Sequence, residues 1–115
     1  MTQLLLRIAA RPKVVTATLQ ALAQVMFQAK LERSCLECQL YAETGNPHSL
    51  LYIEQWTTEQ ELERQLCSQR FGTLLAIMET APVAPCLQIQ TVSDQRGLEY
   101  VEAVRSCPGK YDFHN

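Results

Sequence analysis

The chain has 115 residues, of which 47% are hydrophobic and 19% are charged, a balance typical of one globular domain. The net charge is −2 and no basic stripe follows the sequence, so we expect no nucleic-acid partner. The apolar runs are too short to span a bilayer, and the N-terminus lacks the features of a signal peptide. We therefore expect a cytoplasmic protein, away from membranes, whose five cysteines are free thiols.

The first half of the chain predicts a strand, a helix and a hairpin. Residues 3–9 (QLLLRIA) form the predicted strand. After Pro12, which suits the first turn of a helix, apolar side chains recur at helical spacing: Val15, Leu19, Leu22, Met26 and Ala29. Residues 35–43 and 49–56 then read as two strands, and residues 44–48 between them are dense in turn formers.

The second half predicts a helix and a fourth strand. Thr58 with Glu61 three residues later forms a capping box that marks the start of the helix. Its buried face is expected to consist of Leu62, Leu66, Phe71, Leu74, Leu75 and Met78. Ser68-Gln69 is a point where this helix can divide, and residues 86–92 form the fourth strand.

The predicted order βαββαβ favours an α+β, ferredoxin-like fold, with two helices on one face of an antiparallel sheet. We expect this domain to occupy residues 1–95. Residues 96–115 are expected to be a C-terminal extension, in which residues 97–105 form either a fifth strand or a short helix and residues 106–115 form a loose tail.

Strand alternation divides the predicted sheet into two faces. The face expected under the helices is apolar: Leu4, Leu6, Ile8, Leu36, Cys38, Leu40, Leu51, Ile53, Leu87 and Ile89. The other face mixes aromatic and charged residues: Leu5, Arg7, Glu37, Gln39, Tyr41, Leu50, Tyr52, Glu54, Trp56, Gln88, Gln90 and Val92. We expect a second copy of the chain to cover this face, which makes the protein a homodimer.

Residues 32–71 read ERSCLECQLYAETGNPHSLLYIEQWTTEQELERQLCSQRF. This stretch resembles the antibiotic biosynthesis monooxygenase (ABM) domain in a combination of positions: Cys35, Glu54, Trp56, Leu66, Ser68 and Phe71. The resemblance implies a dimeric α/β barrel with a pocket in each subunit between sheet and helices. Relatives of this kind include oxygenases that need no metal or flavin, enzymes that process aldehyde signals, and haem-degrading enzymes.

The chain departs from the family pattern at four positions. Gln65 and Arg70 stand where family members often carry histidines, and Cys38 stands where they often carry a tyrosine. Haem-degrading relatives carry a tryptophan at the position of Gln65 and a haem-binding histidine at that of Leu75. Leucine cannot ligate iron, so we do not expect haem degradation by that arrangement.

Six residues are candidates for a pocket or for contact with a substrate: Trp56, Tyr52, Gln65, Arg70, Phe71 and Cys38. Trp56 and Tyr52 either stack on a flat aromatic substrate or pack in the core or interface. Gln65 is a candidate to hydrogen-bond a substrate carbonyl. Arg7 and Glu54 either polarise a phenol or form a structural charge pair across adjacent strands, which we favour.

No metal or cofactor is expected, and no catalytic residue is assigned. Cys35 and Cys38 lie three residues apart on a strand, which predicts thiols on opposite faces that cannot jointly bind a metal. His48 and His114 are the only histidines and are expected at the surface. Four glycines are too few for a glycine-rich cofactor loop.

Two main hypotheses for function follow. The first is a cofactor-independent monooxygenase that acts on a quinol or polyphenol with O2, a reaction that tolerates a site without histidine or metal. The second is a non-catalytic dimeric module that binds a small ligand or a partner. A purely structural dimer is the remaining alternative if no pocket exists.

Overall fold

The computed structural model describes residues 1–107, and residues 108–115 of the predicted tail lie outside this range. The elements are, in chain order, β1 (Thr2–Ala9), the 3-10 helix η1 (Pro12–Val14), α1 (Val15–Lys30), β2 (Cys35–Glu43), β3 (Asn46–Trp56), α2 (Glu59–Leu66), α3 (Gln69–Glu79), β4 (Cys86–Thr91) and α4 (Leu98–Arg105).

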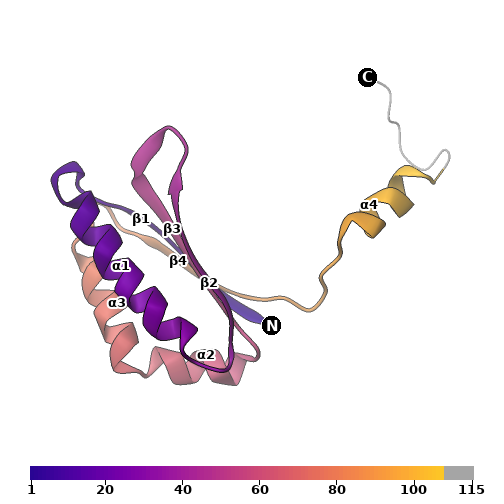
Figure 1. Cartoon of the computed structure of the whole chain (residues 1–115), viewed down its shortest axis with the longest axis horizontal. Helices are drawn as coiled ribbons and strands as arrows, with labels where there is room; N and C mark the ends of the chain where they lie inside the picture. Colours follow the sequence, from indigo (N-terminus) through magenta and orange to yellow (C-terminus); the bar gives the residue numbers. More distant parts are fainter. Residues whose placement is uncertain (108–115) are drawn as a thin grey trace.

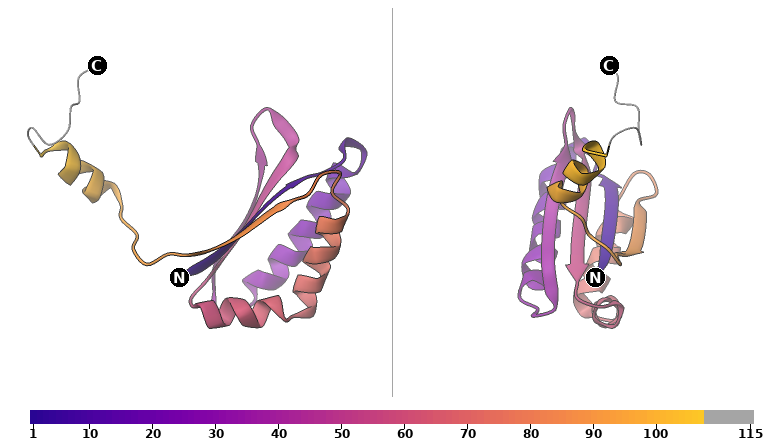
Figure 2. Two further views of the ribbon diagram at one scale, coloured as in Figure 1. Left: turned by 180° about the vertical axis from the view of Figure 1, so that it is seen from behind. Right: turned by 90° about the vertical axis from the view of Figure 1, so that its right-hand side faces the viewer.

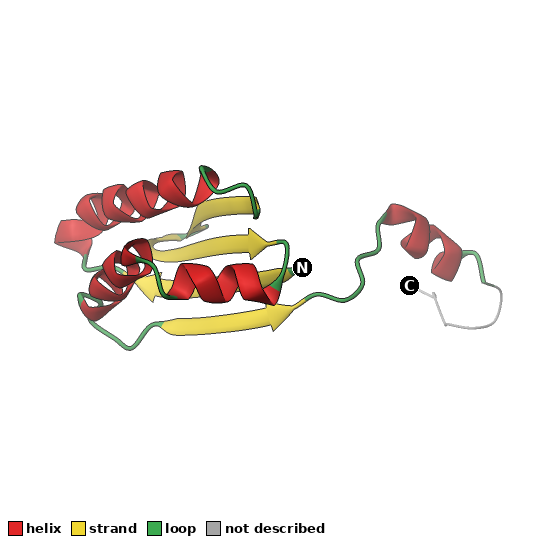
Figure 3. Ribbon diagram, turned by 90° about the horizontal axis from the view of Figure 1, so that it is seen from below, coloured by secondary structure: helices red, strands yellow, loops and turns green. Residues whose placement is uncertain are grey.

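The four strands form one antiparallel sheet in the order β2-β3-β1-β4. The helices α1, α2 and α3 cover one face of this sheet, and its other face, called here the open face, carries no helix in the described part of the chain (Figure 1, Figure 3). This arrangement confirms the predicted ferredoxin-like α+β fold.

Local signals start and stop the elements largely as the sequence predicts. The Thr58 hydroxyl accepts a hydrogen bond from the Glu61 backbone N–H at 3.2 Å and begins α2. The Ser68 hydroxyl accepts one from Phe71 and begins α3, so the predicted break is real. Gly45 has a φ of 83°, which favours glycine at the hairpin turn, and β3 begins at Asn46, three residues before the predicted start.

The face prediction is wrong for β3. Leu4, Leu6 and Ile8 do lie under the helices, but Glu54, Tyr52 and Leu50 are their partners across the pairing with β1. The side chains of β3 that face the helices are therefore Leu50, Tyr52, Glu54 and Trp56, all buried, whereas Leu51 and Ile53 lie on the open face. Because large apolar residues stand at consecutive positions of β3, the alternation of its side chains does not show which set faces the core. A shift of the pairing by one residue moves every side chain to the other face of the sheet.

A β-bulge corrects the prediction for the two cysteines of β2. Cys35 lies opposite Trp56 and Cys38 lies opposite Glu54, with a register shift between Cys35 and Glu37. Leu36 is the extra residue and is 55% exposed rather than buried under the helices. Both cysteines therefore lie on the face that the helices cover, not on opposite faces.

Two other predicted core positions are exposed. Leu75 of α3 is 44% exposed, because α3 turns Leu74 and Ile77 towards the sheet instead. Ile89 has the predicted facing, opposite Leu4, but it lies on an edge strand and remains 48% exposed.

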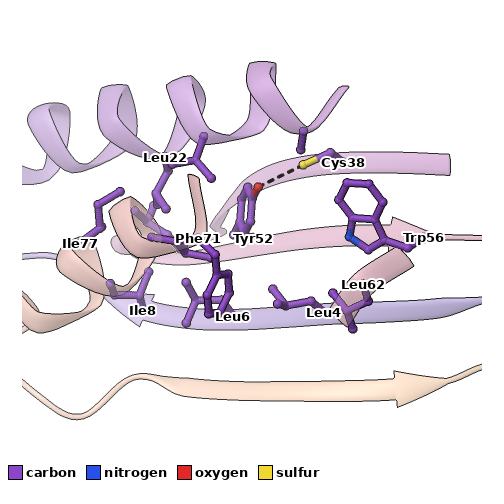
Figure 4. Close-up of a cluster of buried hydrophobic side chains, with 14 of the residues drawn as sticks. Leu4, Leu6, Ile8, Leu22, Cys38, Tyr52, Trp56, Leu62, Phe71 and Ile77 are labelled. Carbon is purple, nitrogen blue, oxygen red and sulfur yellow. Dashed lines mark hydrogen bonds between the residues drawn. The ribbon is translucent and has the colours of Figure 1, made fainter. Parts of the chain in front are cut away.

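The hydrophobic core lies between the sheet and the helices (Figure 4). It joins Leu6 and Ile8 of β1 to Leu22 of α1 and to Phe71 and Ile77 of α3. Burying each such side chain stabilises the fold by about 1.5–3 kcal/mol. At the Trp56 end of β3 this apolar core gives way to the polar group described below.

The segment 97–105 forms the helix α4 and not a fifth strand. Figure 1 and Figure 2 show α4 standing apart from the sheet and the other helices. The boundary of the domain at residue 95 remains a prediction. No helix within residues 1–107 is long and apolar enough to cross a membrane.

Candidate functional site

The carboxylate of Glu54 is the centre of a buried group of polar side chains. Its side chain lies between β3 and the helices with an exposed fraction of 0%. One carboxylate oxygen, Oε1, accepts hydrogen bonds from Trp56 Nε1 at 3.0 Å and from Arg70 Nη2 at 3.2 Å. The other oxygen, Oε2, accepts from the Tyr52 hydroxyl and from Arg70 Nη1. Four donors therefore saturate the buried carboxylate.

The partner of Glu54 is Arg70 of α3, and the predicted pair with Arg7 is wrong. Arg7 is opposite Leu51 in the β1–β3 pairing and lies exposed on the open face. Arg70 approaches from the helix side and forms the buried ion pair. Its guanidinium also lies 5.7 Å from the centre of the Trp56 ring, within the range of a cation–π contact.

Hydrogen bonds extend from this ion pair in two directions. Arg70 Nη2 donates to Gln65 Oε1 at 3.1 Å. On the other side, Cys38 Sγ donates to the Tyr52 hydroxyl at 3.3 Å, a contact visible in Figure 4. We call the connected set the buried polar cluster, which consists of Cys38, Tyr52, Glu54, Trp56, Gln65 and Arg70.

The break between α2 and α3 positions the helix side of the cluster. Gln65 is in the last turn of α2 and Arg70 is in the first turn of α3. Between them, the Ser68 hydroxyl donates to the Gln65 backbone carbonyl and accepts from the Phe71 N–H. One serine therefore ends one helix, begins the next and places both side chains over β3.

The surroundings fix the protonation of several members of the cluster. Burial, with the charge of Glu54, raises the pKa of Tyr52 well above its ordinary value of 10.0. Burial also raises the pKa of Cys38 to about 12, although the hydrogen bond with Tyr52 opposes this rise. Burial lowers the pKa of Arg70, but the hydrogen bonds and charge of Glu54 outweigh it and raise the pKa overall. At neutral pH the cluster thus holds a charged guanidinium beside a neutral phenol and a neutral thiol.

The side chains of the cluster are buried between sheet and helices at this end of the molecule. One residue of the cluster, Cys38, lines a hollow at the surface, a depression of about 270 Å³ along the edge strand β2. We call it the β2 hollow; its lining residues are Lys30, Cys35, Leu36, Glu37, Cys38 and Gln39. Two apolar hollows of about 340 and 590 Å³ lie at the other end, around Arg11 and Val14.

The structure brings the six candidate residues into one region. Five of them belong to the buried polar cluster, and Phe71 packs beside it in the core. Strand alternation predicts Glu54 on the open face and so does not indicate its central position under the helices. The signal that was available is the alternation of Tyr52, Glu54 and Trp56, which share one face of β3 whichever way the strand is turned.

The other chemistry-bearing residues remain apart from this cluster. All five cysteines are free thiols, as predicted. Within residues 1–107 no group of three or more His, Cys, Asp and Glu side chains is arranged to hold a metal ion. His48, expected at the surface, is half-buried, and its Nδ1 atom has no hydrogen-bond partner among the described residues. His114 lies outside the described residues.

The comparison with known proteins rests on structure alone. No protein-family profile matches the sequence, and no curated protein matches it. Among the solved structures that share the fold at low sequence identity, three serve as examples. An antibiotic biosynthesis monooxygenase has a TM-score of 0.72 and 15% identity, with 82% of this chain and 100% of that chain covered.

The second structure, Rv0793 from Mycobacterium tuberculosis, has a TM-score of 0.73 and 15% identity, with 84% of this chain and 98% of that chain covered. The third, PA3566 from Pseudomonas aeruginosa, has a TM-score of 0.69 and 22% identity, with 81% and 94% covered. Identities this low establish a shared fold and not a shared activity. The chain therefore has the fold of the antibiotic biosynthesis monooxygenases, and the resemblance seen in residues 32–71 is confirmed at the level of the fold.

Proposed function

We propose that this chain is a cofactor-independent monooxygenase whose substrate is a quinol or another polyphenol. The observation that carries the proposal is the charged guanidinium of Arg70, which is buried beside the indole of Trp56 and the amide of Gln65. A cation, an aromatic surface and an amide donor in a dry site suit a flat aromatic anion. The name of the solved monooxygenase with the same fold supports this chemistry.

The reaction asks little of the protein beyond binding. A deprotonated polyphenol supplies the electrons that reduce O2, one oxygen atom stays on a ring carbon as a carbonyl, and the other leaves as water. Arg70 and Gln65 would donate to the substrate oxyanion, and Trp56 would pack against the ring. Within residues 1–107 the side chain of Gln65 makes one hydrogen bond, to Arg70, so displacing this side chain frees one guanidinium N–H for the substrate.

The β2 hollow is the proposed mouth of the site. It is the hollow that a cluster residue lines, and from Cys38 the hydrogen-bonded chain leads through Tyr52 to Glu54. Its volume of about 270 Å³ is near the lower limit of small-molecule pockets, which favours substrates of one or two rings.

Oxygen consumption with a panel of one-ring and two-ring quinols tests the proposal. We expect uptake above the spontaneous rate, and Gln65→Leu is expected to reduce it at least about tenfold, because one donor to the oxyanion is lost. Gln69→Leu, at an exposed position in the first turn of α3, is the matched control and should leave the rate unchanged. An uptake equal to the spontaneous rate across the whole panel would contradict the proposal.

The saturation of the cluster favours a second candidate, a non-catalytic module that binds a small ligand. All four hydrogen bonds to Glu54 come from within the chain, so the charged pair is complete without a substrate. Under this alternative a compound from the same panel raises the melting temperature and is recovered unchanged.

We also propose that two copies of the chain associate through their open faces. Tyr52 and Trp56 are not on this face, so the case now rests on other apolar side chains: Leu5, Tyr41, Leu51 and Ile53. Light scattering is expected to give twice the 13.0 kDa mass of the chain. Ile53→Lys is expected to give the monomer mass, because it places a charge in the middle of the contact, and a wild-type protein that is monomeric at micromolar concentration would contradict the dimer.

A further inference from the structure

The helix α4 presents apolar side chains that its own chain leaves uncovered. Leu98 is 68% exposed and Val101 is 47% exposed. Leu98, Val101 and Val104 follow each other at intervals of three residues and so share one side of the helix. Glu102 lies next to Leu98 on the border of this side, and Ala103 points the opposite way.

This helix is an addition to the shared fold. The solved structures are covered over 94% to 100% of their length, whereas 81% to 84% of this chain is covered. The chain is therefore longer than the fold it shares with them, and α4 follows β4, the last strand of the βαββαβ core. An added helix with an uncovered apolar side needs a surface to pack against.

A fitting surface lies on the open face of the sheet. A hollow of about 200 Å³, called here the open-face hollow, is lined by Arg7, Tyr41, Ala42, Glu43, Ser49, Leu50 and Leu51. Tyr41 is half exposed. Arg7 is exposed and has no ion-pair partner among residues 1–107. The hollow thus offers a mixed lining, in which apolar side chains stand beside the cation of Arg7 and the carboxylate of Glu43.

We propose that α4 of one copy docks in the open-face hollow of a second copy. Leu98 and Val101 would cover Tyr41 and Leu51 at the hairpin end of the open face, and Glu102 would pair with Arg7. The contact between the two sheets would then rest on Leu5 and Ile53, nearer the middle of the strands. The proposal rests on the open-face dimer and adds a second contact to it, in which α4 is an arm that reaches the partner copy.

The geometry favours the second copy over the chain's own hollow. β4 ends at Thr91, opposite Thr2, whereas the hollow lies around Arg7 at the other end of β1. The segment 92–97 carries α4 away from its own sheet, on the side opposite α1 and α3 (Figure 1, Figure 2). In a two-fold pair whose facing strands run in opposite directions, the β4 end of one sheet meets the hairpin end of the other. Such a pair forms two identical arm contacts.

The test compares two substitutions in the full-length chain and measures the dissociation constant of the dimer by sedimentation over a dilution series. Val101→Asp is expected to raise this constant at least about tenfold, because it places a charge in the docked side of α4. Ala103→Asp, on the opposite side of the same helix, is expected to leave it unchanged. Equal constants for the two variants would overturn the arm and leave the sheet dimer standing, whereas a monomeric wild type would overturn both.

Exchanging the charges of Arg7 and Glu102 tests whether α4 docks in the open-face hollow. Arg7→Glu and Glu102→Arg are each expected to weaken the dimer several-fold, and the double variant is expected to recover most of the loss because each restored pair is of opposite sign. Additive weakening in the double variant would contradict the contact. Hydrogen exchange adds the last check: protection of α4 that does not change on dilution to the monomer would place the arm on its own chain and overturn the proposal.

Discussion

Replacing Glu54 with glutamine is expected to lower the free energy of unfolding by about 3–5 kcal/mol, the usual result of removing one partner of a buried ion pair. The amide has nearly the same shape as the carboxylate, so the change acts on charge. It leaves the guanidinium of Arg70 buried without its counter-ion and replaces one of the two acceptor oxygens with an NH2 group. Tyr52 and Trp56 donate to different oxygens of Glu54, so one of their two hydrogen bonds loses its acceptor. Equilibrium unfolding in urea measures the loss, and Trp56, the only tryptophan, reports it by fluorescence.

An exposed ion pair supplies the matched control. Arg64 of α2 pairs with Glu61 and Glu32 at the surface, where solvent screens the charges. Arg64→Met is therefore expected to change the free energy of unfolding little. If Glu54→Gln were as mild as Arg64→Met, the charged pair would not be a closed, water-free group.

A double variant distinguishes the loss of the whole ion pair from the cost of leaving one of its charges unpaired. Glu54→Leu combined with Arg70→Met removes both charges and leaves an apolar contact, so its loss of stability is expected to be smaller than the sum of the two single losses. A loss of stability in the double variant equal to the sum of the two single losses would show that the two side chains do not act as a unit.

The sequence predicts the elements of this fold well because each has its own local signal. Thr58 and Ser68 begin helices through their hydroxyl groups, and Gly45 permits the hairpin turn. The stripe predicted for α1 is right in part: Leu22 and Ala29 are buried, but the other buried positions are Thr18 and Val25. These signals need only neighbouring residues, so one sequence is enough to read them.

The site could not be predicted in the same way because it depends on pairing between distant segments. Residues 50–53 of β3 are Leu, Leu, Tyr and Ile, and both alternating sets look like a core face. Only the register with β1 decides which set lies inward, and that register also carries Glu54 under the helices. Its partner Arg70 lies 16 residues later across a helix break, a distance that no strand pattern encodes. A strand pattern that repeats every two residues does not predict the β-bulge at Leu36 either.

Raising the pH is expected to unfold the protein through the same cluster. The pKa of Cys38 is about 12 in the folded chain and 9.0 in an unfolded one, so the folded state holds its proton more tightly. Stability from this group is complete below pH 9 and is lost as the pH rises towards 12, by about 4 kcal/mol in total. Tyr52, whose pKa is also raised, adds to the loss above pH 10. Urea unfolding at pH 7, 9 and 10.5 is expected to show a steep fall across the last two values.

Two substitutions test whether Cys38 and Tyr52 cause this loss of stability at alkaline pH. Cys38→Ala and Tyr52→Phe each remove one titrating group, so the fall in stability between pH 9 and 10.5 is expected to be shallower in both variants. At pH 7 Tyr52→Phe also loses the hydrogen bond to Glu54, at a cost of about 1.5–3 kcal/mol. Cys67→Ala, at an exposed thiol, is expected to keep the full alkaline fall.

The size of this fall also bears on function. A burial-driven rise in pKa requires that water stay away from Cys38 and Tyr52, and the same exclusion would protect a substrate anion at Arg70. A wild-type protein equally stable at pH 7 and 10.5 would mean that water reaches the cluster through the β2 hollow. The charged pair would then be solvated, and the proposed stabilisation of a phenolate by Arg70 would lose its physical basis.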